Sequence, residues 1–308
     1  MRTSENPLVY RIAQLISFLL GIRVFVLVFF AFTLYVSTFF LFSQEESLRR
    51  FVFDYKVHGI IVCSVLSIAA GGLINQFYDL EKDRLQRPFR SKLQRFLKQK
   101  YFLYSYVVLN AFSLGVAGIL SFRIFIFFVV YQFLMWFYSH KLSKLLVWNN
   151  LVFVSLTLYP FFGMLVYYRH FSQIIFLMAV FLFISLLIID LIKDILTMRP
   201  DAVFGYRTLP IAVGVKGTVR VLGLLLVLNA VLGLLISSLG ALGWMDGYFL
   251  ASSIVFLSAL YPLVFFRLRR VFWLLNLLRL WVFVGVLFML FNGVSERGMG
   301  AFYFSLLF

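Results

Sequence analysis

The acidic residues of this 308-residue chain are few and lie close together. Half of the twelve acids fall in two short segments, each at the end of a long apolar run, and these six are Asp79, Glu81, Asp83, Asp190, Asp194 and Asp201. A carboxylate at the edge of a hydrocarbon layer costs a few kcal/mol unless it is paired, hydrated or bound to a metal. The clustering therefore favours a chemical role over simple neutralisation of the nearby Lys and Arg.

The spacing of these acids is that of one face of a helix, because residues four apart in sequence lie on the same side. Two stripes are expected, one formed by Asn75, Asp79 and Asp83 and the other by Asp190, Asp194, residue 197 and Asp201. The second stripe requires a helix that passes Pro200. This proline could end or kink the helix one turn early.

Oxygen ligands without a His or Cys cage suit Mg²⁺, which prefers one or two carboxylates together with water and substrate phosphate oxygens. Two acidic stripes that face each other would hold two Mg²⁺ ions about a diphosphate. Cations interleaved with the acids could stabilise the charge that develops on a leaving pyrophosphate, and these are Arg87, Lys141, Lys193 and Arg207. The implied substrate is an isoprenoid diphosphate whose tail lies in an aromatic-lined tunnel.

The rest of the chain is apolar enough to require a lipid environment. Hydrophobic residues make up 63% of it, with 40 Phe and a mean hydropathy of +0.99, which leaves too little polar surface for a soluble globule. The formal charge of +16 fits membrane topology and anionic headgroups better than nucleic acid, so we expect membrane lipids and no nucleic acid as partners. The single cysteine, Cys63, allows neither a disulfide nor a metal–thiolate site.

Nine segments are long and apolar enough to cross a bilayer, which takes about 20 residues. They are residues 20–43, 57–78, 102–121, 123–138, 145–167, 172–194, 219–239, 247–266 and 272–292. Helices are expected because barrel strands would alternate apolar and polar residues. We therefore predict an all-α integral membrane protein. Residues 1–19 form a cytoplasmic N-terminal segment, 20–292 a single transmembrane bundle with a cytoplasm-facing polar cavity, and 293–308 a short C-terminal tail.

An odd number of spans places the N-terminus and every second loop on one face of the membrane. That face carries nineteen Lys and Arg, against six on the other face. Basic loops tend to stay in the cytoplasm. We predict a multi-pass membrane protein whose N-terminus and acidic clusters are cytoplasmic and whose C-terminus lies on the opposite side.

Three ordered segments resemble the signatures of the UbiA superfamily of intramembrane prenyltransferases. Asn75-Gln-Phe-Tyr-Asp79-Leu-Glu-Lys-Asp83 with Arg87-Pro88 resembles the first signature, Asn-x-x-x-Asp-x-x-x-Asp followed by Arg-Pro. The later segment is similar to the second signature and runs from Lys193-Asp194 through Asp201 to Gly205-Tyr-Arg-Thr208-Leu-Pro210. Between them, the family's Tyr-Ser-x-x-Leu-Lys segment is matched by Tyr138-Ser139-His-Lys141-Leu-Ser-Lys144, followed by Asn150.

The resemblance implies Mg²⁺-dependent transfer of a prenyl group from an isoprenoid (allylic) diphosphate to a lipophilic or aromatic acceptor within the membrane, with release of pyrophosphate. The Mg²⁺ ligands that it implies are Asn75, Asp79, Asp83, Asp190, Asp194 and Asp201. The residues expected to act in catalysis are Asp79, Asp83, Asp194, Asp201 and Tyr138. The residues expected to contact the diphosphate are Arg87, Ser139, Lys141, Lys193 and Arg207.

The chain departs from the family pattern at three positions. Gln76 stands where the family usually has Asp, Thr197 replaces an acid of the second signature, and Pro200 replaces a usual Gly. Three other functions therefore stay open: a UbiA-type membrane terpene cyclase, a catalytically degenerate isoprenoid-binding relative, and a transporter or channel. The position of the acids at one membrane face argues against the last, since transporter sites usually lie near the midplane.

Overall fold

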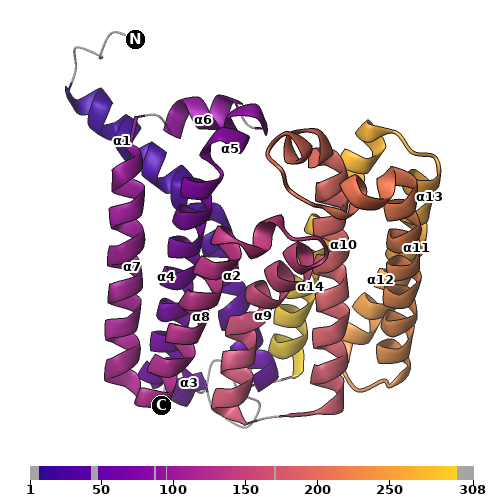
Figure 1. Cartoon of the computed structure of the whole chain (residues 1–308). Coiled ribbons are helices and arrows are strands. Elements are labelled where there is room, and N and C mark those ends of the chain that lie inside the picture. Colours follow the sequence, from indigo (N-terminus) through magenta and orange to yellow (C-terminus); the bar gives the residue numbers. More distant parts are fainter. Residues whose placement is uncertain (1–6, 43–47, 87, 95, 170, 297–308) are drawn as a thin grey trace. The chain divides into compact units, whose positions relative to one another are not determined.

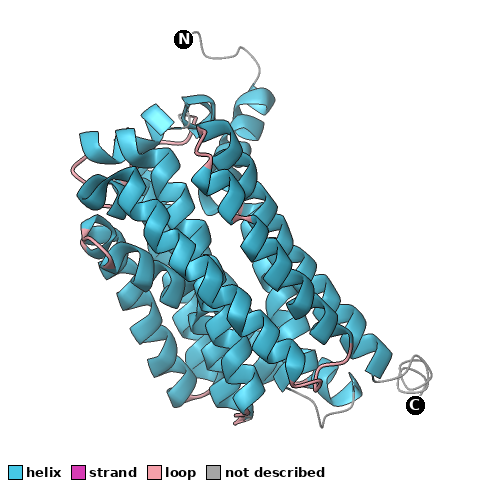
Figure 2. Ribbon diagram, turned by 90° about the vertical axis from the view of Figure 1, so that its right-hand side faces the viewer, coloured by secondary structure: helices cyan, strands magenta, loops and turns pink. Residues whose placement is uncertain are grey.

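A computed structural model describes residues 7–42, 48–86, 88–94, 96–169 and 171–296. These residues form helices joined by short connections (Figure 1), and Figure 2 shows the same chain coloured by secondary structure. Within the described ranges, nine helical segments are long and apolar enough to span a membrane, and they are Val24–Phe42, Tyr55–Tyr78, Gln99–Leu120, Phe122–His140, Trp148–Tyr168, Gln173–Val203, Leu209–Ser238, Trp244–Val264 and Leu268–Ser295. The predicted all-α membrane protein with nine spans is confirmed.

The chain divides into two compact units, each with its own helix packing. The first comprises Met1–Leu34 and Tyr55–Ser143, and the second comprises Tyr35–Asp54 and Lys144–Phe308. Each unit carries one of the two acidic stripes at the end of a long helix. The domain boundaries at residues 20 and 292 stay a prediction.

The first unit is built around α4, which packs against α1, α7 and α8. Its helices are α1 (Pro7–Ile22), the part of α2 (Val24–Ser37) up to Leu34, α4 (Tyr55–Tyr78), α5 (Leu80–Gln86), α6 (Pro88–Gln94), α7 (Gln99–Leu120) and α8 (Phe122–His140). α7 and α8 form the expected hairpin, in which the Oγ of Ser121 accepts a hydrogen bond from the Ile124 N–H at 3.2 Å. The helices α5 and α6 lie outside the predicted spans, and α1 overlaps the first predicted span, 20–43, only at its last three residues.

A buried polar network joins α4, α7 and α8 in the apolar middle of the first unit. The hydroxyls of Ser67 and Ser113 lie 3.1 Å apart, and Gln132 Nε2 donates to Ser67 Oγ at 3.2 Å. Cys63 Sγ donates to the Ser113 carbonyl at 3.3 Å. Small and polar side chains of this kind let helices approach closely where no water competes for their hydrogen bonds. The network fixes α4, whose end carries the first acidic stripe.

The second unit contains the longest helices of the chain. Its elements are a π-helical turn (Thr38–Phe42), α3 (Leu48–Phe53), α9 (Trp148–Tyr168), α10 (Gln173–Val203), α11 (Leu209–Ser238), α12 (Trp244–Ser258), α13 (Leu260–Val264) and α14 (Leu268–Glu296). A short 3₁₀ turn, Leu142–Lys144, lies at the boundary between the units. α10, α11, α12 and α14 share one hydrophobic core that includes Ile188, Leu226 and Leu278.

Two polar contacts lock the core of the second unit. Asn229 Nδ2 on α11 donates to Ser185 Oγ on α10 at 2.8 Å, and Trp281 Nε1 on α14 donates to Ser252 Oγ on α12 at 2.8 Å. The first contact holds α10 in register with α11, and the second holds α14 against α12. The acidic end of α10 is thereby presented by a rigid helix.

The two helices that follow one another at the second motif differ from the predicted spans. α10 passes Pro200 and ends at Val203, because the missing N–H of a proline removes only one bond of the last turns. α11 begins at Leu209, well before the predicted start at residue 219, and Gly214 interrupts its helical backbone with φ 74°. Glycine adopts this left-handed region without a steric cost.

The contact of α11 with α12 depends on Gly233. A Cβ at this position would lie 2.9 Å from the backbone oxygen of Phe249, which cannot rotate away. We expect Gly233→Ala to destabilise the protein by about 1–3 kcal/mol, the range found for overpacked cores. Thermal unfolding in detergent would show a lower midpoint temperature. Gly223→Ala on the same helix is the control, because its nearest neighbour, a Leu260 methyl, lies at 3.7 Å; equal midpoints would contradict the packing.

Candidate functional site

The first acidic stripe lies where α4 meets α5, in the first unit. The Asp79 N–H donates to the Asn75 carbonyl at 2.9 Å and the Asp83 N–H to the Asp79 carbonyl at 2.8 Å. The helical hydrogen bonds therefore continue across the bend at Asp79, and the three residues follow each other at one-turn intervals. All three are partly buried, whereas Glu81 is exposed. The structure thus separates Glu81 from the Asn-Asp-Asp stripe.

The second acidic stripe lies on the last turns of α10, in the second unit. Asp190, Asp194 and Asp201 are 3%, 2% and 1% exposed, which is rare for ionised side chains unless they are paired. Because α10 continues to Val203, the stripe extends to Asp201 as predicted. Thr197 Oγ1 donates to Asp201 Oδ2 at 2.6 Å. The hydroxyl that replaces the family's acid therefore supports the next carboxylate on the same face.

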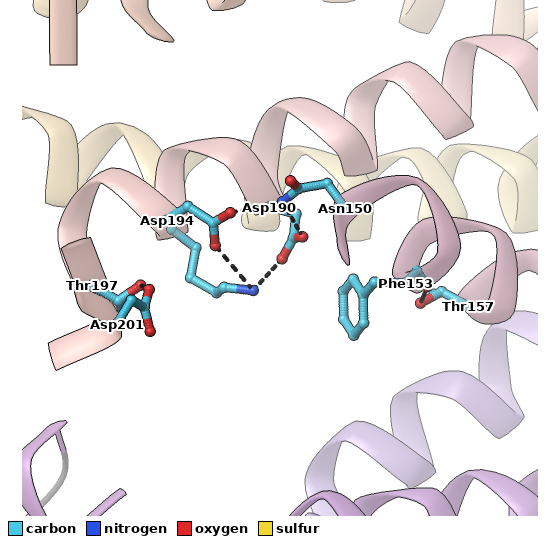
Figure 3. A network of polar contacts seen from close by, with 8 residues as sticks. Asn150, Phe153, Thr157, Asp190, Asp194, Thr197 and Asp201 are labelled. Atoms are coloured by element: carbon cyan, nitrogen blue, oxygen red, sulfur yellow. Dashed lines mark hydrogen bonds and ion pairs between the residues drawn. The ribbon is translucent and has the colours of Figure 1, made fainter. Parts of the chain in front are cut away.

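Asn150 of α9 joins two of these carboxylates (Figure 3). Its Nδ2 donates to Asp190 Oδ2 and to Asp194 Oδ2, both at 2.8 Å. Asn150 is 2% exposed, so the amide and both carboxylates form one buried cluster between α9 and α10. The sequence singled out Asn150 as the residue that follows the third family-like segment, at the start of a span, where it could join helices by hydrogen bonds or approach the acceptor.

Lys193 supplies the positive charge of this cluster. Its Nζ is hydrogen-bonded and ion-paired to Asp190 Oδ1 and lies 3.8 Å from Asp194 Oδ1. The ammonium also lies 5.2 Å from the ring centroid of Phe153 on α9, within the range of a cation–π contact. One lysine thus offsets part of the charge of two buried carboxylates, and Asn150, Asp190, Lys193 and Asp194 form one connected cluster.

At the end of the second motif, α10 ends and α11 begins. The Tyr206 N–H donates to the Asp201 carbonyl at 3.0 Å and the Gly205 N–H to the Ala202 carbonyl at 3.3 Å, the pair of bonds that caps a helix in the Schellman motif. Gly205 has φ 73°, a left-handed conformation that glycine adopts without a steric cost. Thr208 then precedes α11 in an extended conformation, with Pro210 in its first turn.

This turn is tied to the end of the third segment. The Arg207 N–H donates to the Lys144 carbonyl at 3.1 Å, and Lys144 Nζ lies 5.6 Å from the ring centroid of Tyr206. Arg207 itself is exposed. Two motifs about sixty residues apart in sequence therefore meet within the second unit.

The remaining predicted site residues belong to the first unit. Tyr138 is partly buried, and Ser139 is buried with its Oγ donating to the Met135 carbonyl at 3.1 Å within α8. Lys141 follows as the exposed C-cap of α8. Arg87 lies outside the described residues. The predicted roles of all these residues in catalysis stay predictions.

The donor set fits Mg²⁺ bound together with a substrate. Within the part of the chain that the structure describes, no three His, Cys, Asp or Glu side chains are close enough to hold a metal by themselves. Mg²⁺ does not need such a cage, since it usually keeps several waters and binds one or two carboxylates plus phosphate oxygens. Asp190 and Asp194 are already engaged by Asn150 and Lys193.

Comparison with known proteins places this arrangement in context. A model of the UbiA prenyltransferase family matches residues 49–272. A digeranylgeranylglyceryl phosphate synthase from Thermococcus sibiricus is 26% identical over 163 residues, which cover 53% of this chain and 58% of the relative. One from Korarchaeum cryptofilum is 27% identical over 187 residues, covering 60% and 66%. The chain thus spans about three fifths of the length of the curated relatives that it matches.

Solved structures share the fold. A structure of digeranylgeranylglyceryl phosphate synthase is similar with a TM-score of 0.70 and 19% identity, covering 92% of this chain and 99% of the other. A UbiA homolog from Archaeoglobus fulgidus bound to DMAPP and Mg²⁺ is similar with a TM-score of 0.68 and 14% identity, covering 91% and 99%. At these identities the likeness concerns the fold alone.

The cluster around Asn150 predicts a large effect of a small change. Asn150→Leu removes the shared donor of two buried carboxylates, and such unsatisfied groups cost about 1–3 kcal/mol each, or more when charged. We expect a clear drop in the thermal midpoint of the detergent-solubilised protein. Ser155→Ala on the same helix is the control, because that exposed hydroxyl bonds only to the Leu151 carbonyl within α9. A midpoint for Asn150→Leu as high as that of Ser155→Ala would rule out the bridging role.

Proposed function

Because the chain belongs to the UbiA prenyltransferase family, we propose that it transfers a prenyl group from an isoprenoid (allylic) diphosphate to an acceptor within the membrane and releases pyrophosphate. The observation that carries this proposal is that the family match at residues 49–272 includes both acidic stripes and the turn from Gly205 to Pro210. The fold shared with an archaeal homolog that binds DMAPP and Mg²⁺ supports it.

Each acidic stripe is proposed to supply oxygen ligands to Mg²⁺. The residues that would hold Mg²⁺ are Asn75, Asp79, Asp83, Asp194 and Asp201, with Asp190 in support. When bound, Mg²⁺ would neutralise the diphosphate and so favour its departure. We propose two ions, one for each stripe. Asn150 acts as a positioning residue, since it fixes the orientation of Asp190 and Asp194.

Transfer breaks the allylic C–O bond, and its electron pair leaves with the pyrophosphate. The cations proposed to stabilise this charge are Arg87, Lys141, Lys193 and Arg207, with hydrogen bonds from Tyr138 and Ser139. Lys193 has three N–H donors, so it can serve the diphosphate while it stays beside Asp190. An electron pair of the acceptor then attacks the allylic cation, and the proton that the acceptor loses passes to pyrophosphate. Apolar and aromatic walls keep water from the cation.

The acceptor is proposed from the relatives. The curated relatives carry the name digeranylgeranylglyceryl phosphate synthase, which favours a lipophilic acceptor with a glyceryl phosphate group over an aromatic ring. Membrane lipids surround the nine spans and deliver such an acceptor from the side.

The acidic stripes generate the central prediction. Purified protein incubated with Mg²⁺, allylic diphosphates of several lengths and a mixed acceptor pool should yield a prenyl-shifted acceptor by mass spectrometry. Asp83→Asn should lower this turnover at least a hundredfold, because the carboxylate charge is lost while the side-chain shape is kept. Glu81→Gln is the matched control, since Glu81 is an exposed acid of the same helix, and it should keep wild-type turnover.

Other results of this assay would point elsewhere. Pyrophosphate release with only hydrocarbon or alcohol products would favour the terpene cyclase. A protein that binds diphosphate without turnover, and gains turnover in Thr197→Asp, would favour the degenerate relative, since Thr197 stands in place of a family acid. Wild-type turnover in Asp83→Asn would refute the assignment of the stripe.

The membrane orientation is proposed from the distribution of basic residues, with the N-terminus and both acidic stripes in the cytoplasm and the C-terminus outside. Cys63 is the sole cysteine and is buried, so single cysteines can be placed in a Cys63→Ser background. Lys92→Cys should react with a membrane-impermeant maleimide only after the cells are permeabilised. Arg123→Cys, at the connection between α7 and α8, should react in intact cells. The opposite pattern would reverse the proposed topology.

A further inference from the structure

A cavity of about 210 Å³ lies within the first unit, beside the first acidic stripe. It is enclosed by the end of α4, by α5 and α6, and by the start of α7. Its lining includes Gln76, Phe77, Leu80, Arg84, Gln94 and Lys98. The cavity could hold several water molecules or a group the size of a phosphate ester, since one water occupies about 30 Å³ in the liquid.

The cavity opens on a different helical face from the acidic stripe. Gln76, Leu80 and Arg84 each follow a member of the Asn75-Asp79-Asp83 stripe by one position. One residue rotates a helix by about 100°. The same two helices therefore present carboxylates on one face and the wall of this cavity on the next, so that the cavity is a separate site.

Three amide atoms on two side chains of the wall have no hydrogen-bond partner within the described part of the chain. Gln76 is 5% exposed and Gln94 is 4% exposed, and neither amide atom of Gln76 nor the Nε2 of Gln94 has a hydrogen-bond partner there. A buried amide without a partner is costly, because its hydrogen bonds to water are lost and not replaced. Native proteins satisfy such groups with water, ions or ligands. Both residues line the cavity. Their unpartnered amide atoms are themselves closed to solvent, so a ligand in the cavity would reach them once the side chains turn.

The helix that carries Gln94 is fixed from its other side. Ser17 Oγ of α1 donates to the Gln94 carbonyl at 3.0 Å, and Arg90 Nη2 donates to the Leu20 carbonyl at 2.6 Å. These bonds engage the backbone of Gln94 and leave its amide side chain in the cavity wall. These two hydrogen bonds therefore hold α6, which forms part of the cavity wall, against α1.

The charge of the wall selects the kind of ligand. Arg84 and Lys98 are both exposed and line the cavity, whereas its described lining residues include no Asp or Glu. Arginine, lysine, amide and hydroxyl groups together form the donor set that proteins use for phosphate oxygens. Phe77, Leu80 and Phe102 add an apolar wall for the carbon atoms next to such a group.

We propose that this cavity binds the phosphate of an anionic headgroup through Arg84, Lys98 and the amides of Gln76 and Gln94. A lipid with a glyceryl phosphate group has this chemistry, and so does free phosphate. The inference goes beyond the proposed transfer reaction and does not depend on it, because the cavity uses none of the residues assigned to the donor diphosphate.

Binding tests the proposal without any turnover. The protein is reconstituted in nanodiscs of phosphatidylcholine with or without phosphatidylglycerol, in the absence of Mg²⁺ and isoprenoid diphosphate, and retained lipid is measured by native mass spectrometry. In a separate arm, inorganic phosphate and glycerol phosphate are titrated by calorimetry. Retention of phosphatidylglycerol alone identifies a lipid headgroup as the ligand, and binding of the soluble phosphates identifies a free anion. Either result supports the phosphate site.

The variants locate the site. The double variant Arg84→Gln with Lys98→Gln should weaken binding at least tenfold, and Gln76→Leu should weaken it without unfolding the protein. The matched control is Lys92→Gln with Lys100→Gln, which removes the same charge from exposed neighbours that do not line the cavity, and binding should stay within twofold of wild type. Asp83→Asn should also keep binding, which separates this site from the transfer reaction.

Two results would overturn the proposal. One is the absence of binding by either phospholipid or soluble phosphate, which would mean that water alone satisfies Gln76 and Gln94. The other is equal weakening in the cavity variant and in the control, which would reduce the effect to general surface charge.

Discussion

Hydrocarbon offers no water to a carboxylate, and this constraint governs how the second unit is built. Asp190 and Asp194 are buried near the end of a membrane-spanning helix, where an unpaired charge would be expensive. Asn150 donates to both of them, and Lys193 lies beside both and offsets part of their negative charge. The position of α9 against α10 is therefore coupled to the ionic state of the candidate site. A ligand that draws Lys193 away would also act on the packing of the two helices.

The turn after α10 gives a structural reason for two residues of the family signature, Gly205 and Pro210. Gly205 supplies the left-handed residue that closes the helix, and Pro210 stands in the first turn of the next one. The segment between them bonds to Lys144 through the Arg207 N–H. Part of the second signature thus specifies the end of α10, the turn after it and the start of α11. Its acids lie on the helix that this turn terminates.

The first unit presents two different surfaces from one pair of helices. The stripe of Asn75, Asp79 and Asp83 carries negative charge, and the next face carries Gln76 and Arg84 toward a cavity with a basic mouth. Side chains of opposite charge, Asp83 and Arg84, thus lie on adjacent faces of α5. Gln76 in place of the family's usual Asp belongs to the second of these faces, where a carboxylate would repel a phosphate.

Local sequence determined the number of spans and the two acidic stripes, because apolar length and four-residue periodicity are properties of short segments. It did not determine the passage of α10 through Pro200, since the turn beyond the proline is closed by bonds to Tyr206 and Gly205. The partners of the carboxylates were also beyond it: Asn150 and Asp190 are forty residues apart in sequence. Likewise, only the fold of α5 and α6 against α4 and α7 brought Gln76 and Gln94 to one cavity. Contacts of this kind depend on how helices pack, which periodicity within a helix does not specify.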